Sequence, residues 1–513
     1  MSIKRDLLTG GHFLVLLCAA GLLLNGCQPA TESKSASSSA ASTEQHAETI
    51  WESFYLQGAK IGYGRTTVRP VTRDEQNLIQ TESLNHLWIT RFGQTSKQDL
   101  QMSSLETPDG KLIEFQTVVS FGPVPTVVTG KVAGDKLQLT TATQGQKQAS
   151  SIPWSTDIGG FRAVENSLAR QPLKAGEKRS LRMLMPLVNQ VADVELAAHE
   201  IEDTEILGVK TRLLRVESVS KLSGQVMAAT LWLDAAGEVL KSHVAALDQL
   251  SVRSTEALAK APGGDADKLD LGVDLFVKVE PPLAKPHQSS EVVYRVDLAS
   301  ADPKAVFADG PTQKVKALGP HTAEITVTSR RPLANRSGID NPEKAPAEYL
   351  TANSILQLND ERLKQMAAEA KGDATEPAQI AVALEKYVHG AMKQQDFSQG
   401  FATAAEVAES RAGDCTEHAV LLAALARIHG IPSRVAIGLV YVEAAGAFGY
   451  HMWTEVFLDG QWIPLDATIG RGGTSAAYLK LNDSSLEGAS AYSSFLSVAQ
   501  VLGQLKVSVI SSK

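Results

Sequence analysis

Arg411-Ala-Gly-Asp-Cys415-Thr-Glu-His418 marks the start of a helix whose first residue is a cysteine. Asp414 can cap this helix, and Gly430 can end it before Pro432. Its apolar face would comprise Ala419, Leu422, Leu425 and Ile428. Unpaired N–H groups and the positive end of the helix dipole favour a thiolate there, and they can donate to an oxyanion on a substrate carbonyl. The stretch therefore indicates a nucleophilic cysteine.

A predicted strand pair follows this helix. Residues 434–441 form an apolar run that is typical of a buried strand, and residues 443–450 form a loop rich in Gly and Ala. A second strand starts at His451. The residue types at 459–460, Asp-Gly, suit a two-residue turn that leads into a strand over 461–465. The sequence thus predicts a β-hairpin with a histidine at its start.

The register of this hairpin brings His451 close to Asp466. With a two-residue turn, Trp453 lies opposite Asp466, and His451 lies opposite Thr468. Residues two apart share a face, so His451 and Asp466 are diagonal neighbours, roughly 7 Å apart or less between Cβ atoms. In that geometry Cys415 can attack, His451 can move the proton, and Asp466 can orient the ring. A one-residue slip would turn Asp466 to the opposite face.

Four ordered blocks of residues carry a family resemblance. They are Gly413-Asp-Cys-Thr-Glu-His-Ala419, Gly430-Ile-Pro-Ser-Arg434, His451-Met-Trp-Thr-Glu455 and Trp462-Ile-Pro-Leu-Asp-Ala-Thr468. Their order and spacing resemble the transglutaminase-like superfamily, most closely over residues 404–470. The resemblance implies a papain-like α+β core without a metal ion, in which Cys415 is the nucleophile, His451 the base and Asp466 the orienting residue. Ala467 stands where the family often has proline.

The resemblance implies chemistry on amide or peptide bonds through a cysteine thioester. A lysine amine can take the acyl group, which gives crosslinking, or water can take it, which gives hydrolysis. Acyltransferase and cysteine protease or amidase activities therefore both stay open. A second donor to the oxyanion is expected upstream of the nucleophile, from Tyr387, Gln394 or Gln395.

Two other functions are compatible with the same residues. The first is a catalytically silent transglutaminase-fold protein that binds or scaffolds in the cell envelope, with Cys415 as a small buried hydrophobe. The second is a metal site of Cys415, His418 and His451, since Cys415 and His418 are spaced to share a helix face. The chain offers one thiolate and no second Cys/His pair for such a site, so no metal or cofactor is predicted.

The N-terminus resembles the signal of a bacterial lipoprotein. Basic residues at 4–5 precede an apolar run, 13–24, that is too short to span a bilayer as a mature helix. The run ends in Leu24-Asn-Gly-Cys27, which departs from the usual pattern at its asparagine, and cleavage by an ordinary signal peptidase is the alternative. Cys27 is the expected lipidation site. We therefore expect a lipid-anchored protein of the bacterial cell envelope, facing the periplasm or the exterior, with Cys415 as its free thiol.

The composition narrows the class of partner. The formal net charge of −8 becomes −9 when residues 1–26 are removed, so nucleic acid is not an expected partner. A hydrophobic content of 43% is typical of globular proteins, and the length predicts two or three domains. The expected partners are a protein or peptide substrate of the cell envelope and the membrane that holds the lipid. The oligomeric state does not follow from the sequence.

Shifts in composition and periodicity divide the chain into seven segments. The expected segments are a signal peptide (1–26), a flexible Ser/Ala-rich tether (27–48), a large antiparallel β domain (49–258), a linker (259–287), a small β unit (288–345), a transglutaminase-like catalytic domain (346–480) and a C-terminal extension packing on the core (481–513). The overall fold class is α+β. Trp51, Trp88, Trp154 and Trp232 are expected in the core of the β domain, with a ligand groove as the alternative.

Overall fold

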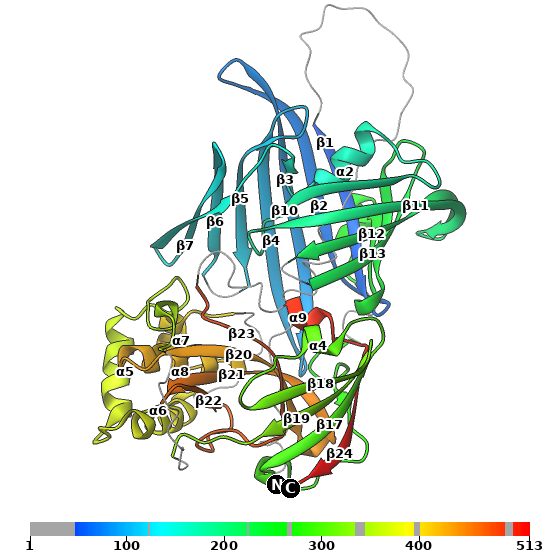
Figure 1. Cartoon of the computed structure of the whole chain (residues 1–513). Coiled ribbons are helices and arrows are strands. Elements are labelled where there is room, and N and C mark those ends of the chain that lie inside the picture. Colours follow the sequence, from blue (N-terminus) through cyan, green and yellow to red (C-terminus); the bar gives the residue numbers. More distant parts are fainter. Residues whose placement is uncertain are drawn as a thin grey trace, which may run out of the picture.

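A computed structural model describes residues 47–121, 124–222, 225–263, 269–333, 344–393, 401–487 and 496–513. The fold is α+β and mostly β, as predicted, with a large sheet, a small sheet and a C-terminal region of helices and strands (Figure 1). In the described part of the chain, no helix is long and apolar enough to cross a membrane. The predicted signal peptide and the lipidation site Cys27 lie outside the described residues.

The large sheet has the strand order β8-β7-β6-β5-β4-β3-β2-β1-β15-β14-β13-β12-β11-β10-β9. Its strands are β1 (Glu48–Leu56), β2 (Ala59–Arg73), β3 (Gln76–Arg91), β4 (Gln94–Glu106), β5 (Leu112–Ser120), β6 (Thr126–Ala133), β7 (Lys136–Thr143), β8 (Gln146–Pro153), β9 (Ile158–Gly159), β10 (Lys178–Met185), β11 (Gln190–Ile206), β12 (Val209–Leu222), β13 (Gln225–Leu233), β14 (Val239–Val244) and β15 (Gln249–Ser254). Neighbouring strands are antiparallel except β9 and β10, which run parallel. The first and last strands therefore pair in the middle of the sheet.

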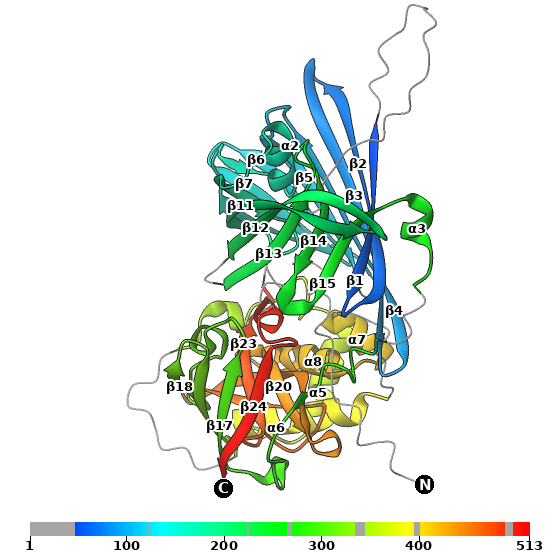
Figure 2. The ribbon, with the colours of Figure 1, turned by 90° about the vertical axis from the view of Figure 1, so that its right-hand side faces the viewer.

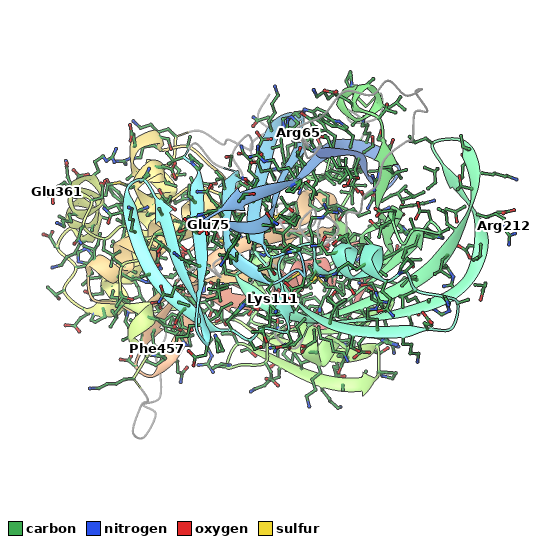
Figure 3. The ribbon with its side chains drawn as sticks, turned by 90° about the horizontal axis from the view of Figure 1, so that it is seen from above. Arg65, Glu75, Lys111, Arg212, Glu361 and Phe457 are labelled. Carbon is green, nitrogen blue, oxygen red and sulfur yellow. The ribbon has the colours of Figure 1, made fainter. Side chains whose placement is uncertain are left out.

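The two halves of this sheet share one apolar core. Phe54 of β1 and Leu87 of β3 belong to the same buried cluster as Val194 of β11 and Val216 of β12. Helix α2 (Ala163–Arg170) adds Leu168 to this cluster. In Figure 3, a view from above, Arg212 of the β11–β12 hairpin and Glu361 of the helical region lie on opposite sides of the molecule.

The prediction of a core position was wrong for three of the four tryptophans. Trp154 is buried in a second apolar cluster, whereas Trp51, Trp88 and Trp232 are only half-buried. Core residues of β1 alternate with Trp51, so this ring points to the outer face of the sheet. There Trp51 and Trp88 pack against Tyr63, with ring centroids 6.0 and 5.9 Å away. Aromatic character alone could not distinguish the two faces.

The small β unit is a four-stranded sheet in the order β18-β19-β17-β24. Its strands are β17 (Glu291–Leu298), β18 (Gln313–Gly319), β19 (Thr322–Thr328) and β24 (Leu505–Ser512). The last strand comes from the expected C-terminal extension, which pairs with β17 along its length. The extension is thus part of this sheet.

The C-terminal region combines a five-stranded sheet with a group of helices (Figure 2). The sheet runs β16-β21-β20-β23, and β22 pairs with β21. The strands are β16 (Val277–Lys278), β20 (Ser433–Val442), β21 (Ala447–Leu458), β22 (Gln461–Leu465) and β23 (Tyr478–Ser484), and the helices are α5 (Glu361–Lys371), α6 (Pro377–Ala391), α7 (Ala404–Ser410) and α8 (Cys415–Ile428). Helix α8 packs against β20 and β21.

Strand β21 is longer than predicted. It begins at Ala447, because residues 447–450 pair with residues 439–442 of β20 and close most of the expected loop. Short helices complete the description: α3 (Glu256–Lys260), α4 (Pro303–Val306), α9 (Leu496–Ala499), η1 (Ala245–Leu247), η2 (Pro286–Gln288), η3 (Ala347–Tyr349) and η4 (Glu443–Ala445). The longer β21 leaves His451 inside a paired strand.

Candidate active site

The start of α8 is fixed by a capping box. Asp414 accepts the N–H of Thr416 at 2.9 Å, and Glu417 accepts the N–H of Asp414 at 2.9 Å. Gly413 has a φ of +142°, and a Cβ there would lie 2.4 Å from Cγ of Glu417, so only glycine fits. These contacts make Cys415 the first residue of α8, as predicted.

The β21–β22 hairpin has the predicted register. Leu458 pairs with Gln461, and Thr454 pairs with Leu465, where the ladder ends. Asp466 is the next residue, and its Oδ2 lies 2.8 Å from Nε2 of His451. The two side chains that the sequence placed on one face are therefore in hydrogen-bond contact.

The carboxylate of Asp466 has three donors. Oδ2 accepts hydrogen bonds from His451 and from the hydroxyl of Tyr478 at 2.7 Å, and Oδ1 accepts the N–H of Thr468 at 2.9 Å. Burial by itself would raise the pKa of Asp466, but the charge of His451 and these hydrogen bonds outweigh it and lower the pKa to about 2. Asp466 is thus a carboxylate at neutral pH although its exposed fraction is only 1%.

His451 has one ring nitrogen committed and one available. Since Asp466 accepts a hydrogen bond from Nε2, the neutral ring carries its proton there. Nδ1 is buried and has no hydrogen-bond partner among the described residues. The sulfur of Cys415 accepts the N–H of Met452, the residue that follows His451. Nδ1 is therefore the nitrogen of His451 that can receive a proton.

Cys415 does not have the lowered pKa that its helix position predicted. Burial raises the pKa of the thiol to about 12, and the carboxylates of Glu417 and Asp466 raise it further, although the N–H of Met452 opposes them. The exposed fraction of Cys415 is 1%, and that of His451 is 0%. With this raised pKa, Cys415 is a buried neutral thiol at neutral pH.

His418 belongs to the structure of the helix start. Its Nδ1 donates to the carbonyl oxygen of Asp414 at 2.5 Å, and burial lowers its pKa to about 4, so the ring is neutral. Within the described ranges, no group of three or more His, Cys, Asp or Glu side chains is arranged to hold a metal ion.

The second oxyanion donor stays a prediction. The hydroxyl of Tyr387, one of the three candidates, donates to the exposed carboxylate of Glu369 on α5 at 2.7 Å. Gln394 and Gln395 fall outside the described residues. Sequence reasoning missed Tyr478, which lies on a strand that follows the recognised blocks and carries no local signal of its own.

Three comparisons relate this chain to known proteins. The sequence profile of the transglutaminase-like superfamily matches residues 364–467. No curated protein matches the chain. Among solved structures, a candidate cysteine protease from Cytophaga hutchinsonii has 14% identity and a TM-score of 0.29, and the match covers 42% of this chain and 83% of that one. A β-barrel-like protein from Brucella abortus has 10% identity and a TM-score of 0.29, with 40% and 95% covered.

The profile match begins in α5 and ends just after β22. It contains the capped start of α8 and the hairpin that brings His451 to Asp466. Residues 364–467 of this chain are thus a transglutaminase-like segment, as the four blocks of sequence predicted.

Proposed function

We propose that this chain is a lipid-anchored cysteine enzyme of the bacterial cell envelope that acts on amide or peptide bonds of a protein or peptide substrate. Cys415 is the nucleophile, His451 the general base and acid, and Asp466 the orienting carboxylate. The observation that carries the proposal is the 2.8 Å contact between His451 and Asp466 next to a cysteine at a helix start.

The reaction follows from the positions of these groups. The thiol proton of Cys415 passes to Nδ1 of His451 as the sulfur attacks the substrate carbonyl, and the backbone N–H at the start of α8 faces the oxyanion. The amine leaves with the proton from Nδ1, which gives a thioester. Water or a primary amine then loses a proton to Nδ1 and attacks the thioester, and the thiol is restored. Asp466 stabilises the imidazolium during both steps.

The test is mass spectrometry of the full chain incubated with envelope extract and a labelled primary amine. Incorporation of the amine into a protein identifies transfer, and new free termini identify hydrolysis. Cys415→Ala should abolish both products. Retention of full activity by Cys415→Ala on the identified substrate would refute the proposal.

The lipid anchor has its own control. Cys27→Ala removes the proposed lipidation site and leaves the C-terminal region unchanged. We expect this variant to lack the acyl mass and to leave the membrane fraction, while its Cys415 is alkylated at the wild-type rate in detergent. An unchanged acyl mass or membrane fraction would contradict the anchor alone.

One observation favours a second candidate, a silent scaffold. Cys415 is 1% exposed, so the described form offers no open nucleophile. A scaffold predicts that folded protein is labelled neither by iodoacetamide nor by a glutamine-derived electrophile at neutral pH. Labelling that Cys415→Ala removes would exclude the scaffold.

A further inference from the structure

Glu385 is a buried carboxylate directly behind the Asp466–His451 pair. It lies on α6 and has an exposed fraction of 1%. Its Oε1 accepts the N–H of Asp466 at 2.9 Å and the N–H of Gly473 at 3.2 Å. Among the described residues it forms no ion pair with Lys or Arg. The buried carboxyl group of Glu385 is therefore bonded only to backbone N–H groups. Such burial lowers the stability of the fold, which suggests that Glu385 has a functional role.

The backbone that Glu385 holds is the loop from Asp466 to Gly473. His389, one turn further along α6, lies with Nδ1 3.0 Å from the carbonyl oxygen of Ala467. Gly470 passes so close to His389 that a Cβ there would lie 2.5 Å from its ring. Helix α6 thus binds the loop through two side chains on one helix face.

We propose that Glu385 is a positioning residue for the Asp466–His451 pair, which it serves by fixing the backbone of the Asp466 loop against α6. This inference rests on the proposed function of Cys415. Both oxygens of Asp466 are bonded to other groups, and these hydrogen bonds keep their lengths only while the backbone of Asp466 stays in place. The N–H of Asp466 is bonded directly to Glu385, so a shift of this anchor moves the carboxylate relative to His451.

The charge of Glu385 adds a second effect. Burial raises its pKa to about 7, the backbone N–H groups oppose this, and the charge of Asp466 adds to it. Among the described residues, Tyr478 on β23 also interacts with the charge of Glu385, and His389 lies one turn away on α6. Above neutral pH the ionised Glu385 is a second negative charge beside the backbone of Asp466, and we expect this charge to change the pH dependence of the site.

The experiment compares Glu385→Ala, which removes the acceptor, with Glu385→Gln, which keeps an oxygen acceptor but cannot ionise. Glu369→Gln is the matched control, because Glu369 is an exposed carboxylate on the neighbouring helix. Two quantities are measured in full-length protein: the rate of Cys415 alkylation by iodoacetamide against pH, and the NMR signal of the His451 Nε2 proton, assigned by its absence in His451→Gln.

We expect Glu385→Ala to shift or broaden the His451 ring signal and to slow alkylation roughly 10- to 100-fold. Glu385→Gln should keep the ring signal but lose the part of the pH profile with a midpoint near 7. It should also unfold at an equal or higher temperature than the wild type at pH 8, because an ionised buried carboxylate has been removed. If Glu385 only supported the fold, its variants would lower the unfolding temperature and the alkylation rate in parallel.

Two outcomes are decisive. Wild-type ring signals and wild-type pH profiles in both Glu385 variants would overturn the positioning role. A wild-type Cys415 that no pH renders reactive would overturn the proposed function instead, and the His451 ring signal would still report whether Glu385 positions Asp466.

Discussion

Asp466→Asn removes the charge that orients His451 while it preserves the shape of the side chain. The pKa of Asp466 is about 2 in the folded protein, against an ordinary value of 3.8. This difference corresponds to about 2 kcal/mol of folding free energy at pH 7. Because the folded pKa is the lower one, this stability is present above pH 3.8 and is lost as the pH falls towards 2.

The assay is urea denaturation of the wild type and Asp466→Asn at two pH values. We expect the variant to be less stable by about 2 kcal/mol at pH 7 and by less than about 1 kcal/mol at pH 2.5, where much of the charge effect has been lost. Asp373→Asn, an exposed change in the turn between α5 and α6, should leave stability unchanged at both. An equal loss for Asp466→Asn at pH 7 and pH 2.5 would refute the charge argument.

The same variant tests the chemistry. An asparagine has no charge to stabilise the imidazolium, so the rate of acyl transfer from the identified substrate should fall roughly 100-fold or more, at unchanged expression. Loss of stability without loss of rate would mean that Asp466 supports the fold and not the reaction.

Two further variants address the surroundings of the site. Tyr478→Phe removes the hydroxyl that donates to Asp466 at 2.7 Å. We therefore expect the pKa of Asp466 to rise and the stability at pH 7, measured by urea denaturation, to fall by about 1 kcal/mol. An unchanged midpoint of acid unfolding would contradict this. Gly413→Ala places a Cβ against Glu417 at a φ of +142°, whereas Gly430→Ala has a φ of +71° and open space around it. We expect Gly413→Ala to lower the thermal unfolding temperature more than Gly430→Ala does. Equal decreases would mean that the clash with Glu417 is relieved.

The sequence was sufficient to predict the features of the fold that depend on residues close together in the chain. The cap at Asp414 and the glycine at 430 set the limits of α8, and the Asp-Gly turn set the register that brings His451 to Asp466. Each of these depends on a few neighbouring residues. The prediction of an α+β fold around residues 404–470 is confirmed for the same reason.

Features that depend on burial and on distant segments could not be predicted in this way. The pKa of Cys415 is governed by desolvation, which outweighs the helix terminus that the sequence reveals. Tyr478 and Glu385 reach Asp466 from β23 and α6, on either side of the hairpin in the sequence. The outward position of Trp51 follows from the phase of its strand, which a list of aromatic residues does not contain.

The pairing of β17 with β24 has a consequence for the order of folding. Ser289 and Ser512, whose hydroxyls are 3.4 Å apart at this junction, are separated by 223 residues. The transglutaminase-like segment lies between these strands in the sequence, so the small sheet closes only after that segment has been synthesised and has brought its two ends together. Because Tyr294 of β17 also donates to the carbonyl oxygen of Ala476, release of β24 would loosen a sheet that packs directly against the C-terminal region.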